Sequence, residues 1–126
     1  MKALLDTSVL IATDAARLEG ELAMSAASLA ELHVGVLVTT DAAVRAERLR
    51  RVSGLQRKFD ALPIDEDVAT SNGQLAAVVA STGRQPRSRV MDLLIAATAH
   101  AHAARLYTRN AADLAGIEHL IEIVSV

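Results

Sequence analysis

Cysteine is absent from the sequence, and aromatic residues are almost absent. Without cysteine the protein has no disulfide bonds, thiolate zinc sites or cysteine nucleophiles, and this composition fits a reducing cytoplasm. Phe59 and Tyr107 are the only aromatic side chains among 126 residues, so stacking of bases on aromatic rings is a poor way for this chain to bind nucleic acid. We expect an aliphatic core, because Ala, Leu and Val supply most of the 52% hydrophobic residues.

Long hydrophobic segments are also lacking. Asp6 interrupts the N-terminal apolar run, whereas a secretory signal needs about 7–15 apolar residues and a membrane-spanning helix about 20. We therefore expect neither kind of segment and a cytoplasmic protein. The 13 basic and 15 acidic residues give a net charge of −2. Because nonspecific nucleic-acid binders are usually strongly basic, any contact with nucleic acid must be local.

What the sequence does contain is a series of short strands alternating with helices. Its 126 residues suit one domain, spanning residues 1–126. Predicted strands cover residues 2–5, 23–27, 62–64, 105–108 and 119–124. Predicted helices cover residues 28–37, 41–59, 65–81 and 88–103, with a loop at 83–87 and a helical turn at 110–113. This alternation predicts an α/β fold with one parallel β-sheet flanked by helices, and Pro63 predicts that the third strand lies at an edge.

Four carboxylates follow predicted strands or begin the helices after them. These residues are Asp6, Glu31, Asp92 and Asp113. In a parallel sheet these places share the carboxyl edge, where ligand crevices form. Converging carboxylates repel one another, and a divalent cation relieves that repulsion. Because oxygen ligands suit hard ions, such a cluster favours Mg²⁺ or Mn²⁺.

Each of these acids also has a purely structural interpretation. Negative side chains are stabilised in the first turn of a helix by its free backbone N–H groups. Ser28 and Glu31 have the spacing of a capping box, and Asn110 and Asp113 have the same spacing. Asp65 also follows a strand, so position alone does not choose among the acids.

Four motifs together resemble the PIN-domain ribonucleases. They are LDTSVL at residues 5–10, SLAEL at 28–32, VMDLLIAATA at 90–99 and LYTRNAADL at 106–114. Each motif alone is weak, but the set occurs in the right order and spans essentially the whole chain. Within that family the sequence is most similar to the VapC-type toxins of bacterial type II toxin–antitoxin pairs.

The resemblance implies a Mg²⁺- or Mn²⁺-dependent endoribonuclease that is inhibited by a cognate antitoxin, with a homodimer inside a larger toxin–antitoxin assembly. Asp6, Glu31, Asp92 and Asp113 match the four catalytic, metal-binding acids of the family. Asp6 and Asp92 are then the expected direct metal ligands. The neighbouring polar residues that would support these ligands or contact RNA are Thr7, Ser8, Thr108, Arg109 and Asn110.

Basic residues and histidines are weaker candidates. Many relatives carry a further acid shortly before the third Asp, where this chain has Arg87 and Arg89. Arginines that flank the proposed site in sequence are expected RNA contacts, namely Arg84, Arg87, Arg89 and Arg109. The basic run at residues 45–51 either guides RNA or forms a solvated helix face paired with Glu47. Surface or rim positions are expected for His33, His100, His102 and His119.

Other classes of protein fit the sequence less well. Receiver domains need adjacent acids after the first strand and a lysine at the end of a late strand, and neither Lys2 nor Lys58 has that place. Haloacid-dehalogenase-like phosphatases need Asp-x-Asp, but Ser8 stands at the third position. A PIN-like protein that binds RNA or a partner without cutting is the remaining alternative, and retention of all four acids argues against it.

Overall fold

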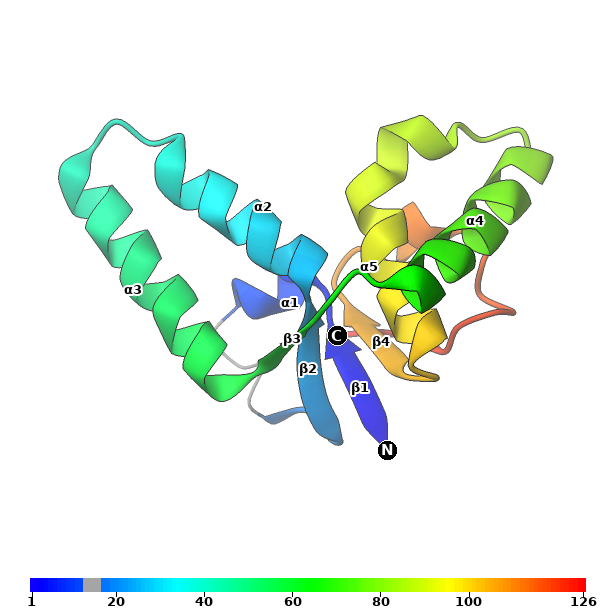
Figure 1. Ribbon diagram of the computed structural model, residues 1–126, viewed down its shortest axis with the longest axis horizontal. Coiled ribbons are helices and arrows are strands. Elements are labelled where there is room, and N and C mark those ends of the chain that lie inside the picture. Colours follow the sequence, from blue (N-terminus) through cyan, green and yellow to red (C-terminus); the bar gives the residue numbers. More distant parts are fainter. Residues whose placement is uncertain (13–16) are drawn as a thin grey trace.

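The computed structural model describes residues 1–12 and 17–126, apart from the side chains of residues 87 and 88. Its centre is a sheet of five parallel strands in the order β3-β2-β1-β4-β5 (Figure 1). The strands are β1 (Lys2–Leu5), β2 (Glu21–Ser25), β3 (Asp60–Leu62), β4 (Arg105–Thr108) and β5 (Ile123–Ser125). The predicted α/β fold with a parallel sheet is confirmed, and β3 lies at an edge as Pro63 predicted.

Helices cover both faces of the sheet. They are α1 (Thr7–Leu10), α2 (Ala26–Leu37), α3 (Ala42–Lys58), α4 (Glu66–Ser81) and α5 (Val90–Ala101), with 3₁₀ turns η2 (Pro86–Arg89) and η3 (Ala111–Leu114). Successive residues of β1 serve opposite faces, as the pleat of a strand requires. Leu4 packs in a core with residues of α4 and α5, whereas Leu5 packs in a second core with Leu10 and Phe59. The first core is aliphatic, as the composition predicted, whereas the second also holds both aromatic side chains, Phe59 and Tyr107.

Several predicted boundaries differ from those of the structure. The second, third and fifth strands lie at Glu21–Ser25, Asp60–Leu62 and Ile123–Ser125 instead of 23–27, 62–64 and 119–124. The third strand ends at Leu62 because Pro63 has no N–H to continue the ladder. The predicted loop at 83–87 runs into η2, so α5 begins at Val90 instead of Ser88. It ends at Ala101, two residues early, because Ala103 has a left-handed φ of 50°.

The start of α2 corrects the predicted capping box. Ser25 is the N-cap, and its hydroxyl accepts a hydrogen bond from the Ala27 N–H at 3.0 Å. Ser28 is instead buried inside the helix, and the first turn of α2 holds no acid. The capping-box prediction for Ser28 and Glu31 is therefore wrong. The carboxylate of Glu31 is free of that structural role.

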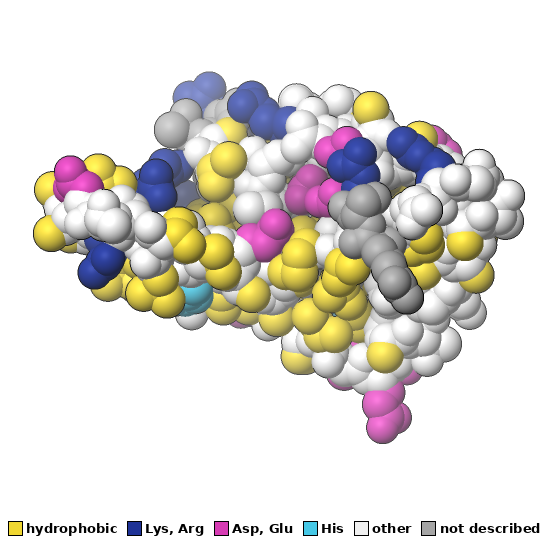
Figure 2. All heavy atoms as spheres, turned by 90° about the horizontal axis from the view of Figure 1, so that it is seen from above, with side chains coloured by type: hydrophobic (Ala, Val, Ile, Leu, Met, Phe, Trp, Pro, Cys, Tyr) yellow, Lys and Arg dark blue, Asp and Glu magenta, His cyan; other side chains and the backbone are white. Residues whose placement is uncertain are grey.

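The parallel arrangement brings the carboxyl ends of all five strands to one edge of the sheet, which is uppermost in Figure 1. Figure 2 looks onto this carboxyl edge from above and shows acidic side chains near the middle, with basic side chains on both sides. Within the described ranges, none of the helices combines the length and the apolar character needed to cross a membrane.

Candidate active site

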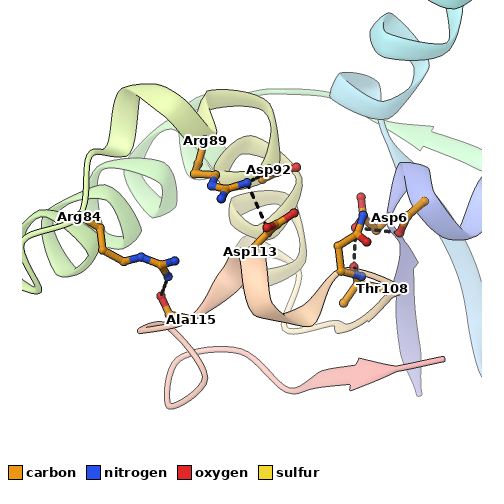
Figure 3. A network of polar contacts seen from close by, with 9 residues as sticks. Asp6, Arg84, Arg89, Asp92, Thr108, Asp113 and Ala115 are labelled. Atoms are coloured by element: carbon orange, nitrogen blue, oxygen red, sulfur yellow. Dashed lines mark hydrogen bonds and ion pairs between the residues drawn. The ribbon is translucent and has the colours of Figure 1, made fainter.

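Asp6 lies at the junction of β1, the central strand, and its neighbour β4. It directly follows β1, and its backbone N–H donates to the Tyr107 carbonyl in β4 at 3.0 Å. Its Oδ2 accepts hydrogen bonds from Thr108 Oγ1 at 2.6 Å and from Ser8 Oγ at 3.2 Å (Figure 3). The buried Thr108 hydroxyl accepts in turn from the Asn110 N–H at 3.0 Å. Asp6 is thus held in one orientation by hydroxyls from two segments far apart in the sequence.

Asp92 and Asp113 share one arginine. Asp92 lies in the first turn of α5, and Asp113 lies in η3 after β4. Arg89 Nη1 is 3.1 Å from Asp113 Oδ1 and 3.8 Å from Asp92 Oδ2, so its guanidinium bridges the two carboxylates (Figure 3). The 3₁₀ turn that precedes α5 places Arg89 one turn before Asp92.

Glu31 reaches the same edge from the second turn of α2. Its Oε1 accepts a hydrogen bond from Thr7 Oγ1 at 2.7 Å, and the Ser28 hydroxyl lies 3.0 Å from the same Thr7 oxygen. Thr7 directly follows Asp6, so the start of α1 connects the two acids. Glu31 is half-buried, and its carboxylate accepts from the Thr7 side chain instead of capping the helix.

The space between the acids is small. Asp6, Asp92, Asp113 and Asn110 line a gap of about 10 Å³ above an apolar floor that includes Ile95. A volume of this size holds about one water-sized particle. Asn110 makes no capping hydrogen bond with its side chain, so the predicted structural role of Asp113 as its capping partner is also wrong.

Electrostatics show that the four acids converge. The pKa of Asp92 is raised, first by burial and then by the negative charges of Asp6, Asp113 and Glu31. The positive charge of Arg89 opposes this rise of the pKa. Each of the other three carboxylates therefore lies within electrostatic range of Asp92, at the edge where the sequence placed them.

The acids are nevertheless not arranged as a finished metal cage. Among residues 1–12 and 17–126, no three His, Cys, Asp or Glu side chains form a group ready to hold a metal ion. Different partners hold the carboxylates instead, because Asp6 and Glu31 accept from hydroxyls while Asp92 and Asp113 face Arg89. The metal-binding roles of the four acids stay a prediction.

The donor set fits a hard divalent cation. All of the converging ligand atoms are carboxylate oxygens, with an amide side chain beside them. In the described part of the chain, Arg89 is the only cationic side chain paired with any of these carboxylates. The negative charge is thus incompletely neutralised, and after burial the neighbouring carboxylates are the next causes of the raised pKa of Asp92. Oxygen-rich, negatively charged sites of this kind suit Mg²⁺ or Mn²⁺.

Other predicted residues lie outside this centre. The Asp65 carboxylate caps α4 by accepting from the Val68 N–H at 3.0 Å, so it is structural. Arg109 is exposed, and its backbone N–H donates to Ser8 Oγ at 3.1 Å. His100 contacts Ser71 Oγ through Nδ1 at 2.8 Å, so it links α5 to α4 instead of standing at the rim. The side chain of Arg87, an expected RNA contact, lies outside the described residues.

The bridging position of Arg89 was not predicted from the sequence. Its spacing of three residues from Asp92 on a helical segment was the available signal, since such residues are neighbours on one face. The contact with Asp113 depends on the tertiary structure and had no sequence signal. In the basic run, Arg50 pairs with Glu47 as the solvated-face alternative predicted, whereas Arg48 and Arg51 contact backbone carbonyls.

The carboxylates lie at the carboxyl edge of a parallel sheet, which is the edge where α/β proteins of this class bind their ligands. Comparison with protein families matches residues 3–117 to the PIN domain. The chain therefore belongs to the PIN domain family. The resemblance found in the four sequence motifs is confirmed.

Individual relatives support this assignment. The chain is 35% identical over 130 residues to ribonuclease VapC5 of Mycobacterium tuberculosis, covering 97% of this chain and 93% of that protein. It is 37% identical over 100 residues to ribonuclease VapC8 of the same species, covering 76% and 88%. A crystal structure of VapBC-5, a member of the VapBC family of toxin-antitoxin systems from M. tuberculosis, matches with a TM-score of 0.85 at 35% identity, covering 99% and 98%.

Proposed function

We propose that this protein is the toxin of a bacterial type II toxin–antitoxin pair, a metal-dependent endoribonuclease that hydrolyses RNA phosphodiester bonds and is neutralised by a cognate antitoxin. The observation that carries the proposal is that Asp6, Asp92 and Asp113 line one gap, with Glu31 held beside it by Thr7. It occurs in a chain that matches ribonucleases and a toxin–antitoxin complex over nearly its whole length.

The site residues divide into ligands and the groups that position them. Asp6 and Asp92 are the proposed direct ligands of Mg²⁺ or Mn²⁺, and Glu31 and Asp113 complete the negative site. When bound, the cation polarises the phosphodiester and neutralises charge that develops during hydrolysis. Thr108 and Ser8 hold Asp6 through their hydroxyl groups, and Thr7 holds Glu31 in the same way. Asn110 lines the gap, where its amide is available to the phosphate.

Three further features belong to this proposal. The whole of residues 1–126 acts as one PIN-like ribonuclease domain. The protein forms a homodimer within a larger assembly that also contains the antitoxin. Because the proposed substrate is cellular RNA, its site of action is the cytoplasm.

Neutralising single carboxylates tests the assignment. Asp92→Asn should abolish Mg²⁺-dependent cleavage of total RNA and growth arrest on expression, since it removes a proposed ligand while keeping side-chain size. Asp65→Asn is the matched control, because Asp65 also follows a strand but caps α4, and Asn caps helices as well as Asp does. Cleavage should also stop with a chelator and with the co-expressed antitoxin. Full activity of the Asp92→Asn protein would disprove the assignment.

A further inference from the structure

Four arginines of this protein are fixed by neutral backbone carbonyls. Arg45 donates to the Thr39 carbonyl at 2.6 Å, Arg48 to that of Gly35 at 2.7 Å, and Arg51 to that of Ile11 at 2.7 Å. Arg84 donates to the Ala115 carbonyl at 3.0 Å. Within the described ranges none of these four has a carboxylate partner. Each guanidinium is therefore oriented without a carboxylate at ion-pair distance, although Glu118 lies within electrostatic range of Arg84.

Arg48 and Arg51 line a pocket on one side of the acidic centre. The pocket lies between α2 and α3, has a volume of about 330 Å³, and also contains Thr7 and Glu31. Its floor is apolar and is formed by residues such as Leu10. Glu31 accepts a hydrogen bond from Thr7, which directly follows Asp6 of the gap between the acids, so this pocket opens beside the acidic centre.

Arg84 lines a second pocket on another side of that centre. Its volume is about 280 Å³, and it contains Arg89 and Asp113, the latter shared with the gap between the acids. Leu93 and Ile117 contribute apolar walls. In Figure 3 the Arg84 side chain lies beyond Arg89 and Asp113 as seen from Asp6. Figure 2 shows basic side chains on both sides of acidic ones near the middle of this face.

We infer that these two pockets hold the backbone phosphates of a single RNA strand that flank the bond to be cut, and this inference rests on the proposed function. Arg48 and Arg51 bind the strand on one side of the acidic centre, and Arg84 binds it on the other. Guanidinium groups suit this task because their planar donors match phosphate oxygens in pairs.

The charge pattern explains why RNA is the occupant. A scissile phosphate next to several carboxylates is repelled until a cation neutralises them, so the strand needs attachment points outside the acidic centre. Arginines without an ion-pair partner, in the pockets on either side, supply such points. Apolar walls beside each arginine accommodate sugars and bases, which compensates for the scarcity of aromatic side chains in this chain.

Binding measurements without cleavage test this inference. The probe is a fluorescein-labelled, mixed-sequence single-stranded RNA of about 12 nucleotides, a length typical of such sites. Its affinity is measured by anisotropy in chelator, over a series of salt concentrations. The variants are Arg48→Gln/Arg51→Gln and Arg84→Gln. Arg45→Gln is the matched control, because Arg45 has the same kind of carbonyl anchor but lines neither pocket.

We expect the double variant and Arg84→Gln each to bind the RNA about tenfold more weakly or worse, and Arg45→Gln to bind within twofold of the wild type. The slope of log K against log salt should fall by about 0.7 for each phosphate contact removed. Arg48→Lys/Arg51→Lys keeps the charge and should restore most of this slope, which a purely structural role would not.

Three outcomes would overturn the inference. Pocket variants that bind RNA like Arg45→Gln would show that the arginines do not contact the strand. Variants that lose affinity for the antitoxin while keeping RNA affinity would assign the pockets to that protein. Failure of the wild-type protein to bind the RNA in chelator would overturn the inference, and failure also to cleave it with Mg²⁺ would contradict the proposed function as well, so the two failures are distinguishable.

Discussion

Replacing Thr108 by valine should weaken both the fold and the proposed metal site. The change preserves the shape of the side chain but removes the hydroxyl that donates to Asp6 Oδ2 at 2.6 Å and accepts from the Asn110 N–H at 3.0 Å. A hydrogen bond to a charged group contributes about 1.5–3 kcal/mol and a neutral one about 0.5–1.5 kcal/mol. Because Asp6 and Asn110 both reach water, we expect the lower part of the combined range, about 2 kcal/mol.

Urea and thermal unfolding of the metal-free protein measure this loss. For 126 residues, an unfolding entropy of about 2.1 cal/mol/K per residue converts 2 kcal/mol to a fall in Tm of about 8 °C. Mn²⁺ affinity, measured by titration calorimetry, should fall about 10- to 100-fold, as is typical when the group that orients a ligand is lost. Thr108→Ser is the control, since it keeps the hydroxyl and loses one methyl group, at a cost of about 1 kcal/mol. Equal stability and equal Mn²⁺ affinity of the Val and Ser variants would refute the reasoning.

Two further changes test other parts of the site. Burial and neighbouring carboxylates raise the pKa of Asp92 in the folded state, so its ionisation costs stability as pH rises from the ordinary value through that raised pKa. Metal-free Asp92→Asn should therefore be more stable than the wild type at pH 7 in denaturant titration, and it should lose less stability between acidic and neutral pH. Lower stability of the variant at pH 7 would contradict this. Ser25→Ala removes the N-cap of α2 and a buried contact with Thr98 Oγ1 at 3.0 Å, so it should cost about 1–2 kcal/mol; a cost below about 0.5 kcal/mol would exclude the capping role.

The sequence predicted the architecture because the decisive signals are local. Short apolar runs that end at Asp6, or within the motif at 106–114, mark strands that stop at a polar edge. Because strands alternate with helices and run parallel, their carboxyl ends meet at one edge of the sheet. The four acids came from the same rule combined with the family resemblance. Asp65 satisfied the same local rule and proved to be a helix cap, so position after a strand is not sufficient.

The errors arose where distant residues decide between local alternatives. Ser25 and Ser28 both have N-cap chemistry, and the capping-box spacing favoured Ser28. Ser25 is the cap because β2 ends there and because Thr98, 73 residues away, contacts its hydroxyl in the buried interior. Arg89 likewise contacts both Asp92 and Asp113, and only the first of these neighbours could be foreseen from helical spacing.

The position of Asp6 between β1 and β4 also bears on how this protein is made. During synthesis the N-terminal residues emerge first. The hydroxyl that orients Asp6 belongs to Thr108, and Asp113 follows it still later in the chain. A nascent chain that ends before β4 therefore lacks the strand that completes the centre of the sheet, together with one of the four acids. The proposed ribonuclease site forms only when translation is nearly finished, so a truncated or unfinished chain is expected to have no ribonuclease activity.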